Sequence, residues 1–159
     1  LITRRVRHAL LAEPAVSMAL RKTQSFPVSA IAPELHRAVD IQQEWARAFR
    51  RPPRIAQAGI VALGAAAQDA ALIARFRDAY AGATAWCQSQ RAACGAEVAA
   101  VESRLSAEAV ADSLGAAPLD AVPAAQARDE LLFLFERLFK RHPQLLGGKL
   151  PDAGFIADT

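Results

Sequence analysis

The feature that most constrains this fold is an apolar pattern at helical spacing near the C-terminal end of the chain. Between residues 124 and 141 large apolar side chains recur at intervals of three and four, and Pro123 stands where a proline favours a helix start. The pattern consists of Leu131, Leu132, Phe135, Leu138 and Phe139. This apolar face is wide, so we expect a sheet or several other helices to cover it.

Five further stretches are predicted to be helical. A helix opened by Pro14 should end near Lys22, because cations suit a helix C-terminus. Asp69 and Ser106 are N-cap candidates for later helices, since short polar side chains accept first-turn amides. The five predicted helices cover residues 14–22, 42–49, 69–87, 92–105 and 106–115. In the tail, Gly147 and Gly148 predict a tight turn, and an apolar Phe155-Ile156 pair is expected to dock on the body.

Three segments are predicted to be extended. Residues 8–12 read as a short buried strand, residues 35–41 allow an extended segment, and residues 55–63 form an apolar run between Pro53 and Gly64 that favours a buried strand. Gly59 within that run indicates a bulge or a close backbone approach. The predicted fold class is therefore α/β, helix-dominated, with at most about four strands.

Composition limits the class of protein. Apolar residues make up 53% of the 159 residues and charged residues 22%, without an apolar run long enough to span a bilayer. Residues 1–54 carry ten Lys and Arg against four Asp and Glu, but no aromatic residues alternate with the arginine groups, so a solvated face is favoured over nucleic-acid binding. The chain begins at Leu1 without a signal-peptide pattern, from which we expect processing of a longer chain.

No motif for catalysis or cofactor binding is present in the sequence. His8, His36 and His142 have no acidic or cysteine partner at metal-ligand spacing, so each is interpreted as a surface or packing residue. A glycine-rich phosphate loop and a Gly-x-Ser-x-Gly motif are also missing. We therefore expect no enzyme activity, no cofactor and no metal.

Cys87 and Cys94 are the two cysteines of the chain. A disulfide would fit if residues 88–93 form a turn between two helices in an oxidising compartment. If the two residues instead lie on one unbroken helix, a rise of about 10 Å exceeds the reach of a bridge. The sequence leaves both arrangements open.

The junction at Glu13 and Pro14 is the strongest candidate for a site. A strand that runs directly into a helix places Glu13 and unpaired first-turn amides at one edge of a sheet, which is where open α/β sheets bind ligands. The same pair of residues is also an ordinary helix start. A third interpretation is structural, because a carboxylate can fix a loop by accepting local amides.

Five stretches in a fixed order carry a resemblance to a known family. In chain order they are LLAEPAVSMAL, RAVDIQQEWARAFRRPPRIAQAGIVALG, DAALIARFRDAYAGATAWC, PAAQARDELLFLFERLF and GGKLPDAGF. Together they resemble the C-terminal part of a periplasmic substrate-binding protein of an ABC importer, of the nitrate, sulfonate, taurine and bicarbonate type.

The resemblance implies a type II periplasmic binding protein fold with two lobes, of which the N-terminal half is absent from this sequence. Residues 1–34 would be a remnant of the second lobe and a linker, and residues 35–159 a return segment and the C-terminal helices of the first lobe. Its implied partners are a small polar or anionic solute and an ABC permease, and its implied location is the periplasm. The implied cleft residues are Glu13, Pro14 and Ser17 on one wall and Gln57, Ala58 and Gly59 on the other.

Two other classes of function are considered beside the importer component. A helical protein-interaction module without a small-molecule ligand would explain the amphipathic helices, and an entirely helical structure would favour it. An enzyme on the same fold would need a reactive residue, and no compelling one is present. The exposed strand edges expected of an incompletely covered sheet also predict a homodimer.

Overall fold

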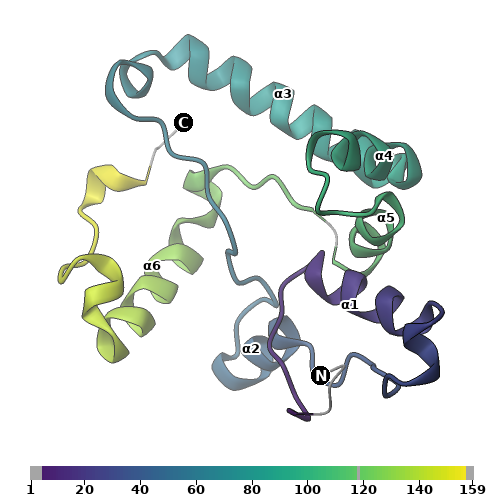
Figure 1. The fold of residues 1–159 in the computed structure, drawn as a ribbon. Helices are drawn as coiled ribbons and strands as arrows, with labels where there is room; N and C mark the ends of the chain where they lie inside the picture. Colours follow the sequence, from purple (N-terminus) through teal and green to yellow (C-terminus); the bar gives the residue numbers. More distant parts are fainter. Residues whose placement is uncertain (1–4, 118, 157–159) are drawn as a thin grey trace. The chain divides into compact units, whose positions relative to one another are not determined.

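A computed structural model describes residues 5–117 and 119–156, and Figure 1 shows the helices along this part of the chain. The α-helices are α1 (Ala15–Gln24), α2 (Ile41–Phe49), α3 (Ala70–Ser89), α4 (Arg91–Val101), α5 (Ala107–Ala116) and α6 (Ala124–Arg141). Short 3-10 helices are η1 (Val28–Ala30), η2 (Gly64–Gln68), η3 (Pro143–Leu146) and η4 (Ala153–Phe155). Among the described helices, none combines the length and apolar character needed to cross a membrane.

The predicted α/β class is wrong, because residues 5–117 and 119–156 contain six α-helices and no strand. The chain therefore does not show the type II periplasmic binding protein fold. Residues 8–12, 35–40 and 55–63 are irregular, and Ile41 begins a helix. An apolar run becomes a strand only when a second strand supplies backbone hydrogen bonds. Among the described residues there is no second strand beside these segments.

The helical predictions are confirmed with small shifts at the ends. The predicted bounds of α6 are those observed, and α3 begins after Asp69, whose carboxylate accepts the Leu72 amide at 2.9 Å. Ser106 caps α5 by accepting the Ala109 amide at 3.2 Å. Gly147 adopts a positive φ of 66° at the end of η3, which confirms the predicted turn.

The described chain divides into two compact units, each formed from two separate stretches. Unit 1 consists of Leu1–Arg37 and Ala79–Ala121, and unit 2 of Ala38–Asp78 and Val122–Thr159. The lobe boundary expected between residues 34 and 35 stays a prediction.

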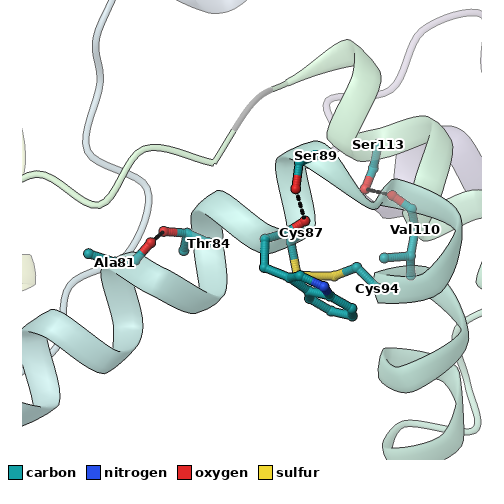
Figure 2. Close-up of a disulfide and its surroundings, with 8 residues drawn as sticks. Ala81, Thr84, Cys87, Ser89, Cys94, Val110 and Ser113 are labelled. Atoms are coloured by element: carbon teal, nitrogen blue, oxygen red, sulfur yellow. Dashed lines mark hydrogen bonds between the residues drawn. A yellow bond between two sulfur atoms is a disulfide. The ribbon is translucent and has the colours of Figure 1, made fainter.

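In unit 1 a disulfide and a small apolar cluster hold α4 in place. Figure 2 shows the bridge between Cys87 near the end of α3 and Cys94 in α4, with a Cα–Cα separation of 5.0 Å. The bridge is possible because α3 ends at Ser89 and Gln90 leaves the helical conformation before α4 begins. Cys94 is buried with Val110 and Leu114 of α5, so the bridge ends inside the core.

The contact between α4 and α5 depends on Gly95. A Cβ atom at this position would lie 2.2 Å from the backbone oxygen of Ala107, which is far inside van der Waals contact. Because the neighbouring atom belongs to the backbone, it has no flexible side chain that could move away. Gly95 therefore allows the two helices to approach closely.

In unit 2 aromatic rings and arginines connect α2 with α6. The Phe133 ring of α6 lies 5.6 Å from Trp45 and 5.4 Å from Phe49, centroid to centroid. The guanidinium groups of Arg51 and Arg137 lie 4.3 Å and 4.7 Å from the centre of the Phe133 ring. Such contacts combine apolar burial with cation–π attraction, and they use long side chains that can adjust.

The predicted docking of the tail is confirmed within unit 2. Ile156 is buried, and its carbonyl accepts a hydrogen bond from Arg128 of α6 at 3.0 Å. Phe155 packs edge-on against Phe135, with ring centroids 6.1 Å apart. The tail therefore covers part of the apolar face of α6.

Candidate functional site

The candidate site lies in unit 1 and begins at the junction between Glu13 and α1. The chain passes Glu13 and Pro14 and enters α1 at Ala15. Glu13 Oε2 accepts the amide of Ser17 at 3.1 Å. The carboxylate thus satisfies one of the amides that a helix N-terminus leaves unpaired, as the structural interpretation of Glu13 predicted.

Arg37 completes a three-residue cluster with Glu13 and Ser17. Its Nη2 donates to Glu13 Oε1 at 2.5 Å and to Ser17 Oγ at 3.0 Å. Ser17 is only 2% exposed, so its hydroxyl is fixed. Partial burial opposes ionisation of Glu13, but the hydrogen bonds from Arg37 and Ser17 outweigh it and keep the pKa of Glu13 below its usual value.

A second ion pair connects α1 with α5. Arg21 Nε donates to Asp112 Oδ2 at 2.5 Å, and Arg21 Nη2 donates to Asp112 Oδ1 at 2.9 Å. This two-point geometry fixes the plane of the guanidinium group. The hydrogen bonds from Arg21 also lower the pKa of Asp112, so the carboxylate stays ionised at neutral pH.

Arg91, the first residue of α4, brings a third guanidinium group to the same place. A Cβ atom on Gly115 of α5 would lie 3.1 Å from Arg91 Nη1, so the glycine leaves room for the arginine side chain. Within the described residues Arg91 has no ion pair. Its charge is therefore available to a ligand.

These side chains surround an open pocket of about 460 Å³ between α1, α4 and α5. Its walls are Ser17, Leu20, Arg21, Gln24, Arg37, Arg91, Ala111, Asp112 and Gly115. Three arginines and one carboxylate, that of Asp112, line the wall, and Glu13 is paired with Arg37. Counting both carboxylates, the pocket has a net charge of +1. Arginines bind carboxylate, sulfonate and phosphate oxygens through paired N–H groups, so this pocket can bind an anion.

The structure separates the predicted site residues into two groups. Glu13 and Ser17 lie in direct contact, Pro14 precedes the first turn of α1, and only Ser17 lines the pocket. Gln57, Ala58 and Gly59 belong to unit 2, where all three are exposed and irregular. His8, His36 and His142 are also exposed, in agreement with their interpretation as surface residues.

Sequence reasoning missed Arg21, Arg37, Arg91 and Asp112. The Glu13–Ser17 contact spans four residues, which a local pattern can reveal, whereas Arg21 and Asp112 are 91 residues apart. Comparisons with protein-family models, characterised proteins and solved structures give no match to this chain. The resemblance to importer binding proteins therefore stays a prediction.

Proposed function

We propose that this chain binds a small monoanionic solute in the arginine pocket of unit 1, in the role of a solute-binding component of an importer. The observation that carries the proposal is the convergence of Arg21, Arg37 and Arg91 on one cavity. The cavity volume of about 460 Å³ lies within the range of small-molecule sites, about 300–1,000 Å³. Delivery to a permease and a periplasmic location come from the family resemblance, and the disulfide is consistent with an oxidising compartment.

The hydrogen bonds leave the arginines able to bind a ligand. Arg37 uses Nη2 for Glu13 and Ser17, and its Nε and Nη1 groups have no partner in the described residues. A guanidinium group has five N–H donors, so three remain on Arg37. Glu13 and Asp112 hold two arginines in fixed orientations, while Arg91 supplies the unpaired charge. A carboxylate or sulfonate with a single charge would neutralise the pocket.

The test is a calorimetric titration of the whole chain with acetate, ethanesulfonate, phosphate and sulfate. Arg91→Gln should weaken binding of the preferred anion by about tenfold or more, because it removes an unpaired charge-assisted donor. Arg75→Gln in α3 is the matched control, since it makes the same charge change at an exposed residue outside the pocket. Equal affinity in the Arg91→Gln variant, or no binding of any of these anions, would contradict the proposal.

A helical protein-interaction module is a second candidate, because the described chain is helical and buries few apolar residues. The buried apolar residues are Cys94, Ala109, Val110, Leu114 and Ile156. The chain exposes 11746 Å², whereas two separate compact domains of half its mass would together expose only about 9,300 Å². The described chain also exposes large apolar side chains, among them Leu10, Phe26 and Val101, and exposed apolar surface is typical of proteins that bind other proteins.

Ligand-linked stability separates the two candidates. An anion that binds only the folded chain raises its free energy of unfolding, by about 2.7 kcal/mol at a hundred times the dissociation constant. The solute-binding proposal therefore predicts an upward shift of the melting temperature with the preferred anion, at constant ionic strength. The interaction module predicts no such shift with any of the four anions.

A further inference from the structure

The disulfide of unit 1 closes a short ring of chain that contains one of the three pocket arginines. The ring runs from Cys87 near the end of α3 to Cys94 in α4 (Figure 2), and Arg91 lies inside it. Residues three and four apart on a helix share a face, so Arg91 lies on the face of α4 that carries Cys94 and Gly95. That face packs on α5, where Gly115 leaves room for the Arg91 side chain. The bridge and the pocket therefore share the first turn of α4.

The start of α4 has little support from its own sequence. Gln90 precedes the helix, and within the described residues its side chain makes no capping hydrogen bond. The first turn has no acidic residue, and Arg91 places a cation at the positive end of the helix dipole, which is unfavourable. In α5, by contrast, Ser106 accepts a first-turn amide and Glu108 supplies a negative charge. The first turn of α4 therefore depends on the bridge more than a capped turn would.

The rest of α4 has support that does not need the bridge. Cys94 packs among apolar side chains of α5, and Gly95 lies against the backbone of Ala107. Two free thiols fill nearly the same volume as a disulfide, so reduction leaves these contacts in place. Opening the bridge should therefore loosen the first turn, and Arg91 with it, while α4 stays packed on α5.

We propose that the Cys87–Cys94 bridge is a redox switch for anion binding in the arginine pocket, and the proposal rests on the function proposed above. The oxidised chain holds Arg91 on the pocket wall and binds the anion tightly. In the reduced chain Arg91 is in place for only part of the time, and the apparent affinity falls by that fraction. The bridge thus positions Arg91, and Arg91 is the residue through which the bridge acts on the ligand.

The switch is opened by a dithiol reductant. Cys87 is half-buried whereas Cys94 is 3% exposed, so a thiolate of the reductant attacks Cys87 Sγ. The bond between the two protein sulfur atoms breaks, and Cys94 leaves as a thiolate. The second thiol of the reductant then attacks the mixed disulfide and releases Cys87. Two electrons pass to the protein, each protein sulfur receives one proton from the reductant, and the dithiol becomes a disulfide.

The first test is a calorimetric titration of the whole chain with and without dithiothreitol, an uncharged dithiol that does not compete as an anion. The probe is whichever of acetate, ethanesulfonate, phosphate and sulfate the oxidised chain binds most tightly. We expect reduction to raise its dissociation constant by about threefold or more. In Arg91→Gln the same reduction should change the dissociation constant by less than about 1.5-fold, because the residue on which the bridge acts is gone. Arg75→Gln, outside the pocket, is the matched control and should respond as the unmodified chain does.

The outcomes separate failure of the switch from failure of the proposed function. An unchanged dissociation constant after reduction, or an equal loss of affinity in Arg91→Gln, would overturn the switch and leave the anion site intact. If the oxidised chain binds none of the four anions, the proposed function is wrong and the switch falls with it.

The second test is hydrogen exchange, followed by nuclear magnetic resonance without any anion. The Cys94 amide donates to the Gln90 carbonyl at 2.8 Å, at the first turn of α4. The Val110 amide is the matched control, since it donates to the Ser106 carbonyl at 3.1 Å at the same position of α5. Reduction should speed exchange of the Cys94 amide by about tenfold or more and that of Val110 by less than about twofold. No acceleration at Cys94, or equal acceleration of the two amides, would overturn the switch.

Discussion

Unit 1 and unit 2 hold their helices together by different means. In unit 1 a covalent bridge joins α3 to α4, a close backbone approach at Gly95 brings α4 against α5, and a few small side chains fill the space between those two helices. In unit 2 α2 and α6 meet through Trp45, Phe49 and Phe133, with arginine stems beside the rings. The comparison indicates that unit 1 is sensitive to single methyl groups, whereas unit 2 can adjust through flexible side chains.

Among the substitutions that test this comparison, Gly95→Ala is expected to lower the free energy of unfolding the most. Its methyl group would lie 2.2 Å from the Ala107 oxygen, so α4 and α5 must separate. We expect the free energy of unfolding of unit 1 to fall by about 3 kcal/mol, the upper range for overpacking. Urea unfolding followed by circular dichroism measures the change.

Gly82→Ala provides the matched control for that experiment. A Cβ atom at Gly82 meets nothing within 4 Å, and the residue lies in the interior of α3. The substitution should stabilise the chain by about 0.5–1 kcal/mol through helix propensity. Similar destabilisation by both alanines would remove the distinction between a tight and an open helix contact.

Phe133→Ala tests unit 2 and should have a smaller effect. The ring contacts two aromatic residues and two guanidinium groups, but it is only half-buried. We expect a loss of about 2 kcal/mol, below the range for a fully buried phenylalanine. In a Trp86→Phe background, Trp45 is the remaining tryptophan and reports on unit 2 by fluorescence. Leu145→Ala, at an exposed position, should cost less than about 0.5 kcal/mol.

Acid should have the smallest effect, and it should act on unit 1. The pKa values of Glu13 and Asp112 are lowered from ordinary values of 4.5 and 3.8, so the folded state favours their ionised forms. The two carboxylates therefore add to the free energy of unfolding. This stabilisation is fully present above about pH 4.5 and is lost as the pH falls through the lowered pKa values. Glu13→Gln should remove part of this pH dependence and cost less than about 1 kcal/mol at neutral pH. An unchanged pH profile in this variant would show that Glu13 is not the titrating group.

Local patterns predicted the helices because the residues that start a helix, cap it and form its apolar face lie within or next to that helix. The bounds of α6 follow from Pro123 and the repeat of apolar side chains, and Ser106 caps α5 within its own first turn. The strands failed for the opposite reason. Residues 55–63 have the composition of a buried strand. A strand also requires a neighbouring strand to accept and donate its backbone hydrogen bonds, and the composition of one segment cannot show whether such a neighbour exists.

The same distinction applies to the candidate site. The contact of Glu13 with Ser17 joins residues four positions apart in the sequence, so it could be anticipated at a helix start. The pairing of Arg37 with Glu13 spans 24 residues, and that of Arg21 with Asp112 spans 91. Neither residue pair forms a sequence motif, because each ion pair is created only when separate stretches of the chain pack against each other.

The short spacing of the two cysteines also affects the order of events during synthesis. Cys87 and Cys94 are seven residues apart, so the loop that their bridge closes is complete before α5 has been made. A short loop loses little chain entropy on closure and can form early. The contact of Arg21 with Asp112 must wait for 91 residues of chain. A nascent chain in an oxidising compartment can therefore join α3 to α4 first, and the arginine pocket is completed only when α5 arrives.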